Sequence, residues 1–128
     1  MAGKLLLDTN AIIALFSGDK QVSARLAEAE AFVPSTALGE LYYGARKSSR
    51  SLQNVAKIEE FAAASQVIAC DAVTAWIYGE TKNRLHSKGR PIPENDLWIA
   101  AVAIQHGLTL VTRDNHFDDV DNLRHENW

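Results

Sequence analysis

The chain has 128 residues, of which 47% are apolar and 23% charged, as in an ordinary globular domain. Its 13 basic and 16 acidic residues give a formal net charge of −3, so overall charge does not indicate nucleic-acid binding. The single cysteine, Cys70, excludes an internal disulfide, and no apolar run approaches the roughly 20 residues that span a bilayer. We expect one soluble domain over residues 1–128 in the cytoplasm, with no membrane partner and with Cys70 buried.

The first third of the chain predicts two strands separated by two helices. The apolar run at 5–7 predicts a buried strand ending at Asp8, because parallel strands covered on both faces lose their alternation. Apolar residues at helical spacing then predict helices over 10–16 and 22–29. Residues 31–34 predict a second short strand, which a proline ends.

A pair of helices follows. Ser35 or Thr36 is expected to cap the helix that carries Glu40 in its second turn. The polar break at 48–51 separates this helix from another over 52–62, and the two are expected to form a helical hairpin.

The second half predicts a strand at 66–70 and two further helices. Asp71 is a good N-cap for the first of these, and Gly89 is placed to end it. Pro93 suits the first turn of the second helix, which is expected to end at Gly107. We interpret the order of these elements along the chain as repeated units of one strand followed by two helices.

Strands at 108–112 and 123–128 complete the pattern. Strands that alternate with pairs of helices are typical of an α/β fold, in which a central parallel sheet carries helices on both faces.

Four acidic residues mark the ends and starts of these elements: Asp8, Glu40, Asp96 and Asp114. Each alone has an ordinary explanation, such as a helix cap, a solvated helix residue or a turn. Together they are unusual, because strand ends and helix starts meet at one edge of an α/β sheet. Carboxylates gathered there repel one another unless a cation lies among them, and hard oxygen ligands favour Mg²⁺ or Mn²⁺.

Four short motifs carry these acids: Asp8-Thr9-Asn10, Ser35…Glu40-Leu41…Gly44, Pro93…Asp96…Ile99-Ala100-Ala101…Ala103 and Leu110-Val111-Thr112-Arg113-Asp114…Phe117. In this order they resemble the motifs of PIN-domain nucleases, and more narrowly those of the VapC-like toxins of bacterial type II toxin–antitoxin pairs. The resemblance covers residues 5 to about 117. No single motif is specific, but the combination is.

The resemblance implies a PIN fold and a metal-dependent endoribonuclease that a small antitoxin inhibits. It also implies a homodimer, structured RNA such as tRNA or ribosomal RNA as substrate, and contact with DNA only through the antitoxin. The four acidic positions of the family correspond to Asp8, Glu40, Asp96 and Asp114 in this chain. Its site hydroxyl corresponds to Thr112, and its small polar position after the first aspartate corresponds to Asn10.

These residues also make chemical sense without the resemblance. Phosphodiester hydrolysis needs an activated water and a stabilised leaving oxygen, and divalent cations supply both. Asp8 and Asp96 are best placed to hold the principal ion, with Glu40 and Asp114 orienting water or holding a second ion. Asp118 or Asp119 is an alternative for the fourth acid, since both lie close behind Asp114.

Basic residues flank the acids. Arg84, Lys88 and Arg90 precede the Asp96 helix and Arg113 adjoins Asp114, so these four are candidates for contacts with RNA phosphates. A solvated charged face is the alternative. His116 follows Asp114 closely, so contact with the substrate is one interpretation; a surface-turn histidine is the one we prefer.

An apolar surface for the antitoxin is expected on the helical hairpin, as a groove for a partner helix. The residues expected to form it are Leu38, Leu41, Tyr42, Leu52, Ile58 and Phe61.

Two other functions fit part of the pattern. A haloacid-dehalogenase-type phosphatase needs a second aspartate two residues after Asp8, where this chain has Asn10. A non-catalytic PIN-like partner in a DNA-binding toxin–antitoxin complex has no use for a repulsive acidic cluster. A Mg²⁺-dependent cleavage assay separates this last alternative from the nuclease.

Overall fold

A computed structural model describes residues 3–128 and shows a five-stranded parallel sheet with the strand order β3-β2-β1-β4-β5. The strands are β1 (Lys4–Leu7), β2 (Glu30–Pro34), β3 (Gln66–Ile68), β4 (Thr109–Thr112) and β5 (His125–Asn127). The helices are α1 (Thr9–Phe16), α2 (Lys20–Ala27), α3 (Ser35–Lys47), α4 (Ser51–Ala63), α5 (Ala72–Ser87) and α6 (Glu94–His106), with a 3-10 turn η1 (Asn115–Asp119). The expected α/β fold class is confirmed.

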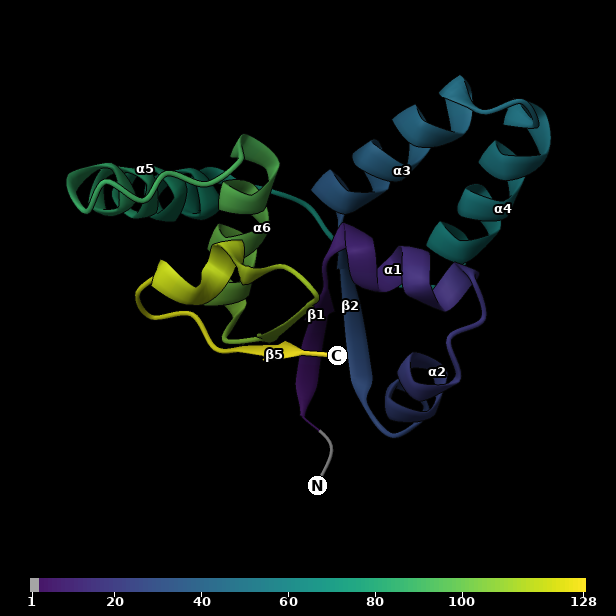
Figure 1. Cartoon of the computed structure of the whole chain (residues 1–128), viewed down its shortest axis with the longest axis horizontal. Coiled ribbons are helices and arrows are strands. Elements are labelled where there is room, and N and C mark those ends of the chain that lie inside the picture. Colours follow the sequence, from purple (N-terminus) through teal and green to yellow (C-terminus); the bar gives the residue numbers. More distant parts are fainter. Residues whose placement is uncertain (1–2) are drawn as a thin grey trace.

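Helices cover both faces of the sheet. In Figure 1, α5 and α6 lie on one side of β1 and β2, and α1 to α4 lie on the other. Helix α6 is the most deeply buried, since Leu97 and Ile99 to Ala103 are almost inaccessible to solvent. This burial explains the nearly continuous apolar run of that helix, which polar residues interrupt only at its ends.

The strand order reverses beside β1. Strands β2 and β3 extend the sheet in one direction, after which α5 and α6 lead the chain back to β4 on the other side of β1. The pairing of Leu5 with Thr109 and of Leu7 with Val111 fixes the register of this junction. In open α/β sheets, ligands bind at the carboxyl ends of the strands where the order reverses. Asp8 and Asp114 closely follow the two strands that flank this point.

Local signals set the helix ends as expected. Asp71 forms a capping box with Thr74 at the start of α5. Gly89 and Gly107 follow α5 and α6 with φ of 69° and 63°, a left-handed conformation that favours glycine. Pro93 precedes the first residue of α6.

Two local predictions are wrong. Cys70 is exposed, because the edge strand β3 ends at Ile68 and leaves the cysteine in the connection to α5. Neither Ser35 nor Thr36 caps α3: the helix starts at Ser35 behind Pro34, without a side-chain cap.

The last residue of the chain is hydrogen-bonded to the end of β4. Beyond β5, the Trp128 backbone N–H donates to the Thr112 carbonyl oxygen at 3.1 Å.

Among the helices of residues 3–128, none combines the length and apolar character that a membrane span requires.

Candidate metal and active site

Asp8 is the buried centre of the site. It N-caps α1, where its Oδ1 accepts from the Ala11 backbone N–H at 2.8 Å. Its Oδ2 accepts from the Thr112 hydroxyl at 2.6 Å, and the residue is only 3% exposed. Two donors therefore fix both oxygens and leave each with a further lone pair for a cation.

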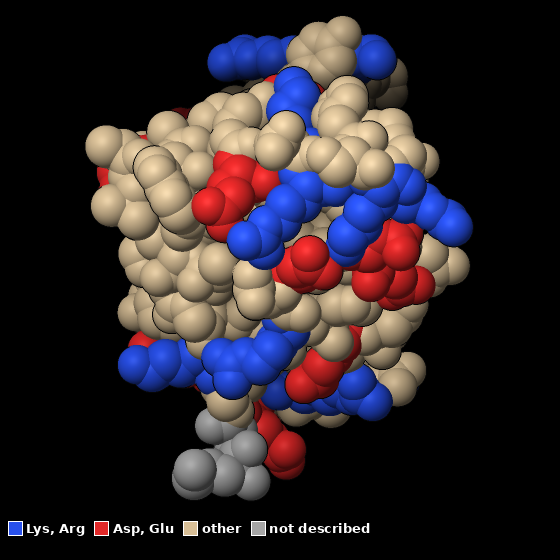
Figure 2. Space-filling view, turned by 90° about the vertical axis from the view of Figure 1, so that its left-hand side faces the viewer, with Lys and Arg blue, Asp and Glu red and all other residues tan. Residues whose placement is uncertain are grey.

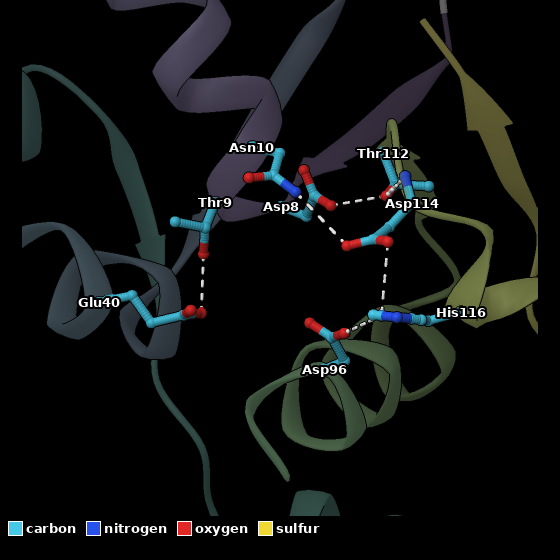
Figure 3. Close-up of polar contacts among 8 residues, drawn as sticks. All are labelled: Asp8, Thr9, Asn10, Glu40, Asp96, Thr112, Asp114 and His116. Atoms are coloured by element: carbon cyan, nitrogen blue, oxygen red, sulfur yellow. Dashed lines mark hydrogen bonds and ion pairs between the residues drawn. The ribbon is translucent and has the colours of Figure 1, made fainter. Parts of the chain in front are cut away.

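Thr112 links the first and fourth acids. Its hydroxyl donates to Asp8 and accepts from the Asp114 backbone N–H at 2.9 Å. This pair of bonds sets the turn after β4 so that Asp114 lies beside Asp8. Asn10 adds a long contact, with its Nδ2 3.4 Å from Asp114 Oδ2. Figure 3 shows these side chains meeting between the ends of β1 and β4.

Asp96 and Glu40 approach from helices. Asp96 lies in the first turn of α6, where the helix dipole favours a carboxylate. Glu40 lies in α3, and its Oε1 accepts from the Thr9 hydroxyl at 2.8 Å. Figure 3 shows both carboxylates facing the same open space as Asp8 and Asp114.

The four acids line one cavity of about 400 Å³. Its other lining residues are Thr9, Asn10, Ile13, Pro93 and His116. No Lys or Arg from residues 3–128 is among them, so histidine is the one basic side chain at the cavity wall. An excess of carboxylate oxygens with room between them fits a hard divalent cation, and the donor set suits Mg²⁺ or Mn²⁺.

The cavity raises the pKa of two acids. Burial raises the pKa of the Asp8 carboxyl, although the hydrogen bonds from Thr112 and Ala11 act in the opposite direction. Burial also raises the pKa of Asp96; His116 lowers it, and the charges of Asp114 and Glu40 raise it further. These two carboxyl groups therefore remain protonated up to a higher pH than exposed aspartates do.

Two site residues were not predicted as such: Thr9 was given no role from the sequence, and His116 was interpreted as a surface-turn histidine in preference to one that contacts the substrate. His116 is not a simple surface-turn histidine, because its Nδ1 lies 2.9 Å from Asp96 Oδ2 and 3.4 Å from Asp114 Oδ1. Its position two residues after Asp114 was the available signal. Thr9 was visible between Asp8 and Asn10, but its bond to Glu40 depends on how α1 packs beside α3.

Three of the four basic residues expected to contact RNA phosphates form ion pairs with acidic side chains of the same chain. Lys88 pairs with Asp121 at 2.8 Å, Arg84 pairs with Glu80, and Arg113 pairs with Asp19. Figure 2 shows basic and acidic side chains interleaved on the face at the α5 side of Figure 1. Arg90 is exposed in the loop before α6. None of these four lines the cavity, so their contact with substrate stays a prediction.

The alternative fourth acids lie outside the cavity. Asp118 is near His125, with 3.6 Å between Oδ1 and Nε2, and Asp119 offers its backbone carbonyl to Lys88. Neither lines the cavity that holds Asp114.

Comparisons with known proteins agree with this architecture. The PIN domain family profile matches residues 5–123. Ribonuclease VapC2 of Haemophilus influenzae is 36% identical over 129 residues, covering 98% of both chains. The tRNA(fMet)-specific endonuclease VapC of Shigella flexneri is also 36% identical, again with 98% of both chains covered. The crystal structure of VapBC2 from Rickettsia felis, bound to a promoter DNA fragment, has a TM-score of 0.91 at 33% identity and covers 98% of both chains.

Proposed function

Since this chain belongs to the PIN-domain family, and within it to the VapC-like group, we propose that it is a divalent-metal-dependent endoribonuclease acting as the toxin of a toxin–antitoxin pair. The observation that carries the proposal is the single cavity in which Asp8, Glu40, Asp96 and Asp114 gather without a lysine or arginine from residues 3–128. Relatives named as ribonucleases over nearly the full length support it.

The position of each acidic residue in the cavity indicates its proposed role. Asp8 and Asp96 would hold the principal cation, because Asp8 is fixed by two hydrogen bonds and Asp96 by the start of α6. Asp114 and Glu40, on either side, would complete the ligand set or hold and orient a water. Thr112 keeps Asp8 and Asp114 in place, and Thr9 does the same for Glu40.

Mg²⁺ or Mn²⁺, when bound, would supply activation of the attacking water and neutralisation of charge at the scissile phosphate. The carboxylate of Glu40 or Asp114, where it holds the water rather than the cation, can accept the proton that the water loses. No histidine base is needed for this step.

The nuclease proposal is tested with purified protein and total RNA. We expect cleavage in Mg²⁺ or Mn²⁺ that EDTA stops, and a loss of at least about 100-fold in Asp8→Asn or Asp96→Asn. Asp118→Asn is the matched control, since this exposed carboxyl lies outside the cavity and its loss should leave cleavage unchanged. Equal cleavage by all four proteins would indicate a contaminating nuclease. An intact protein that binds its partner but cuts no RNA would favour the non-catalytic alternative.

We propose structured RNA, such as tRNA or ribosomal RNA, as the substrate. The name of the Shigella flexneri relative supports tRNA. A small cavity behind a charged surface reads the shape of a loop more readily than an extended sequence. Sequencing of cleavage ends across total RNA should show a few favoured loops, whereas scattered cuts in unstructured RNA would indicate a general ribonuclease.

The proposed antitoxin site is an apolar groove of about 330 Å³ between α1, α3 and α4. Leu41 and Ile58 line it, together with Ile13 and Phe16 of α1. Leu38 and Leu52 were also expected in this groove, but neither lines it. Leu38 is buried, with 8% of its surface exposed, whereas Leu52 is 81% exposed outside the groove.

This groove shares Thr9, Ile13 and Glu40 with the acidic cavity. A partner helix in the groove could therefore extend an Arg or Lys to the carboxylates and block them. The solved VapBC complexes support a protein partner, and DNA would be reached only through it. Co-expression with the adjacent upstream reading frame should restore growth and give a stable complex.

We also propose a homodimer that acts in the cytoplasm, where its RNA substrate is found. Trp76 and Val73, which are 67% and 56% exposed on α5, offer an apolar contact surface. Light scattering should give twice the mass of one chain, and Trp76→Glu should lower it to that of a monomer.

A further inference from the structure

The imidazole of His116 points into the acidic cavity. Its Nδ1 is 2.9 Å from Asp96 Oδ2 and 3.4 Å from Asp114 Oδ1, and these three side chains offer ligand atoms within 4.8 Å of one another. Figure 3 shows the ring between the two carboxylates, on the side of the cavity opposite Glu40.

These separations match the spacing of ligands around one ion. Ligands about 2.1 Å from an octahedral cation and at right angles to each other lie roughly 3.0 Å apart. The two distances from Nδ1 fall close to that value. A hydrogen bond between histidine and aspartate gives a similar distance, so the same geometry serves both the metal-free and the metal-bound protein.

The backbone around His116 is held in place from both sides. Asp114 is fixed through its N–H bond to Thr112, and Phe117, the next residue after the histidine, is fully buried. His116 and Phe117 both lie in the short turn η1, which begins directly after Asp114 and sets the position of the imidazole. The ring therefore reaches the cavity because the fold directs it there.

We propose that His116 is a nitrogen ligand of the catalytic cation and makes this site select Mn²⁺ over Mg²⁺. Mg²⁺ prefers oxygen ligands and keeps its waters, whereas first-row transition ions accept imidazole readily. Mn²⁺ combines that tolerance with a preference for carboxylates, which supply the other ligands here. The inference rests on the proposed metal-dependent function and adds one ligand and a metal preference to it.

The test is pulsed EPR of Mn²⁺ bound to the full-length protein. We expect ¹⁴N modulation from a directly bound imidazole in the wild type, its loss in His116→Asn, and its retention in His125→Asn. His125 is the matched control, because it lies in β5 beside Asp118 and outside the cavity.

Calorimetric titration with each metal alone gives a second measurement. His116→Asn should weaken Mn²⁺ binding by about tenfold or more and change Mg²⁺ binding by less than about threefold, since Mg²⁺ gains little from imidazole. His125→Asn should change neither dissociation constant.

Two results would overturn the inference while the nuclease proposal stands. One is Mn²⁺ bound to the wild type without ¹⁴N modulation, and the other is modulation that survives His116→Asn. In either case RNA cleavage would still require metal and still fail in Asp8→Asn. Absence of any Mn²⁺ binding, together with EDTA-resistant cleavage, would instead reject both proposals.

Discussion

The Thr112 hydroxyl joins Asp8 to the backbone of Asp114, and both groups lose a partner if it is removed. We expect Thr112→Val to lower the free energy of unfolding by about 1–3 kcal/mol, because Oδ2 of the buried Asp8 carboxylate loses its donor and the Asp114 N–H loses its acceptor. Thr112→Ser should restore most of the loss. Urea denaturation checks this, with Thr81→Val as the control, since Thr81 is also buried. Equal losses in Thr112→Val and Thr81→Val would show that the network contributes little.

The pH dependence of stability follows from the raised pKa values of Asp8 and Asp96. Between the usual aspartate pKa of 3.8 and these raised values, the folded protein holds more protons than the unfolded chain. The contribution of these two carboxyls to stability is therefore fully present below pH 3.8 and is lost as pH rises through the folded pKa values.

In EDTA, the wild type should therefore become less stable relative to Asp96→Asn as pH rises through this window. The measured quantity is the difference between their free energies of unfolding. Urea denaturation at a series of pH values measures the difference. A constant difference between the two proteins would contradict the raised pKa of Asp96.

At the level of elements, the two glycines Gly107 and Gly79 should respond in opposite ways to alanine. Gly107 ends α6 in the left-handed region, so Gly107→Ala should cost about 1 kcal/mol. Gly79 lies within α5 with no atom near its added Cβ, so Gly79→Ala should stabilise by about 0.5–1 kcal/mol. Thermal unfolding of both variants checks the signs. A gain in Gly107→Ala would show that another residue can end α6.

The elements were largely predictable because their signals are local. Asp71, Gly89 and Gly107 mark helix ends by their own chemistry, and apolar runs such as 5–7 mark buried strands. Cys70 was misplaced because the length of an edge strand depends on its neighbour rather than on its own residues.

The convergence of the acids was also predictable, because topology brings strand ends to one edge. The partners of those acids were not. The bond of Thr9 to Glu40 and the approach of His116 to Asp96 depend on how α3, α6 and η1 pack, over separations of 31 and 20 residues. The pairing of Lys88 with Asp121 has no local signature either, as the two are 33 residues apart.

For the molecule as a whole, a net charge of −3 requires any RNA contact to be local. Neutralising Lys88 and Arg90 to Gln should weaken RNA binding and reduce the slope of log affinity against log salt by about 0.7 for each phosphate that is no longer neutralised. Gln is preferable to Glu at position 88, because Asp121 lies 2.8 Å from the Lys88 ammonium. Fluorescence anisotropy in EDTA measures the slope.

Lys4→Gln is the control, since Lys4 is exposed at the amino end of β1, away from the site edge. Identical salt slopes in all the variants would remove Lys88 and Arg90 from the binding surface.

The 104-residue separation between Asp8 and Thr112 has a consequence for synthesis of the chain. At about 5–20 residues per second, the ribosome makes Asp8 roughly 5 to 20 seconds before Asp114. Until β4 emerges, β1 lacks one of its two neighbouring strands and Asp8 lacks the hydrogen bond from Thr112. Under the proposed function, a growing or prematurely ended chain that lacks β4 would have an incomplete acidic site and would not cut RNA before translation is nearly complete.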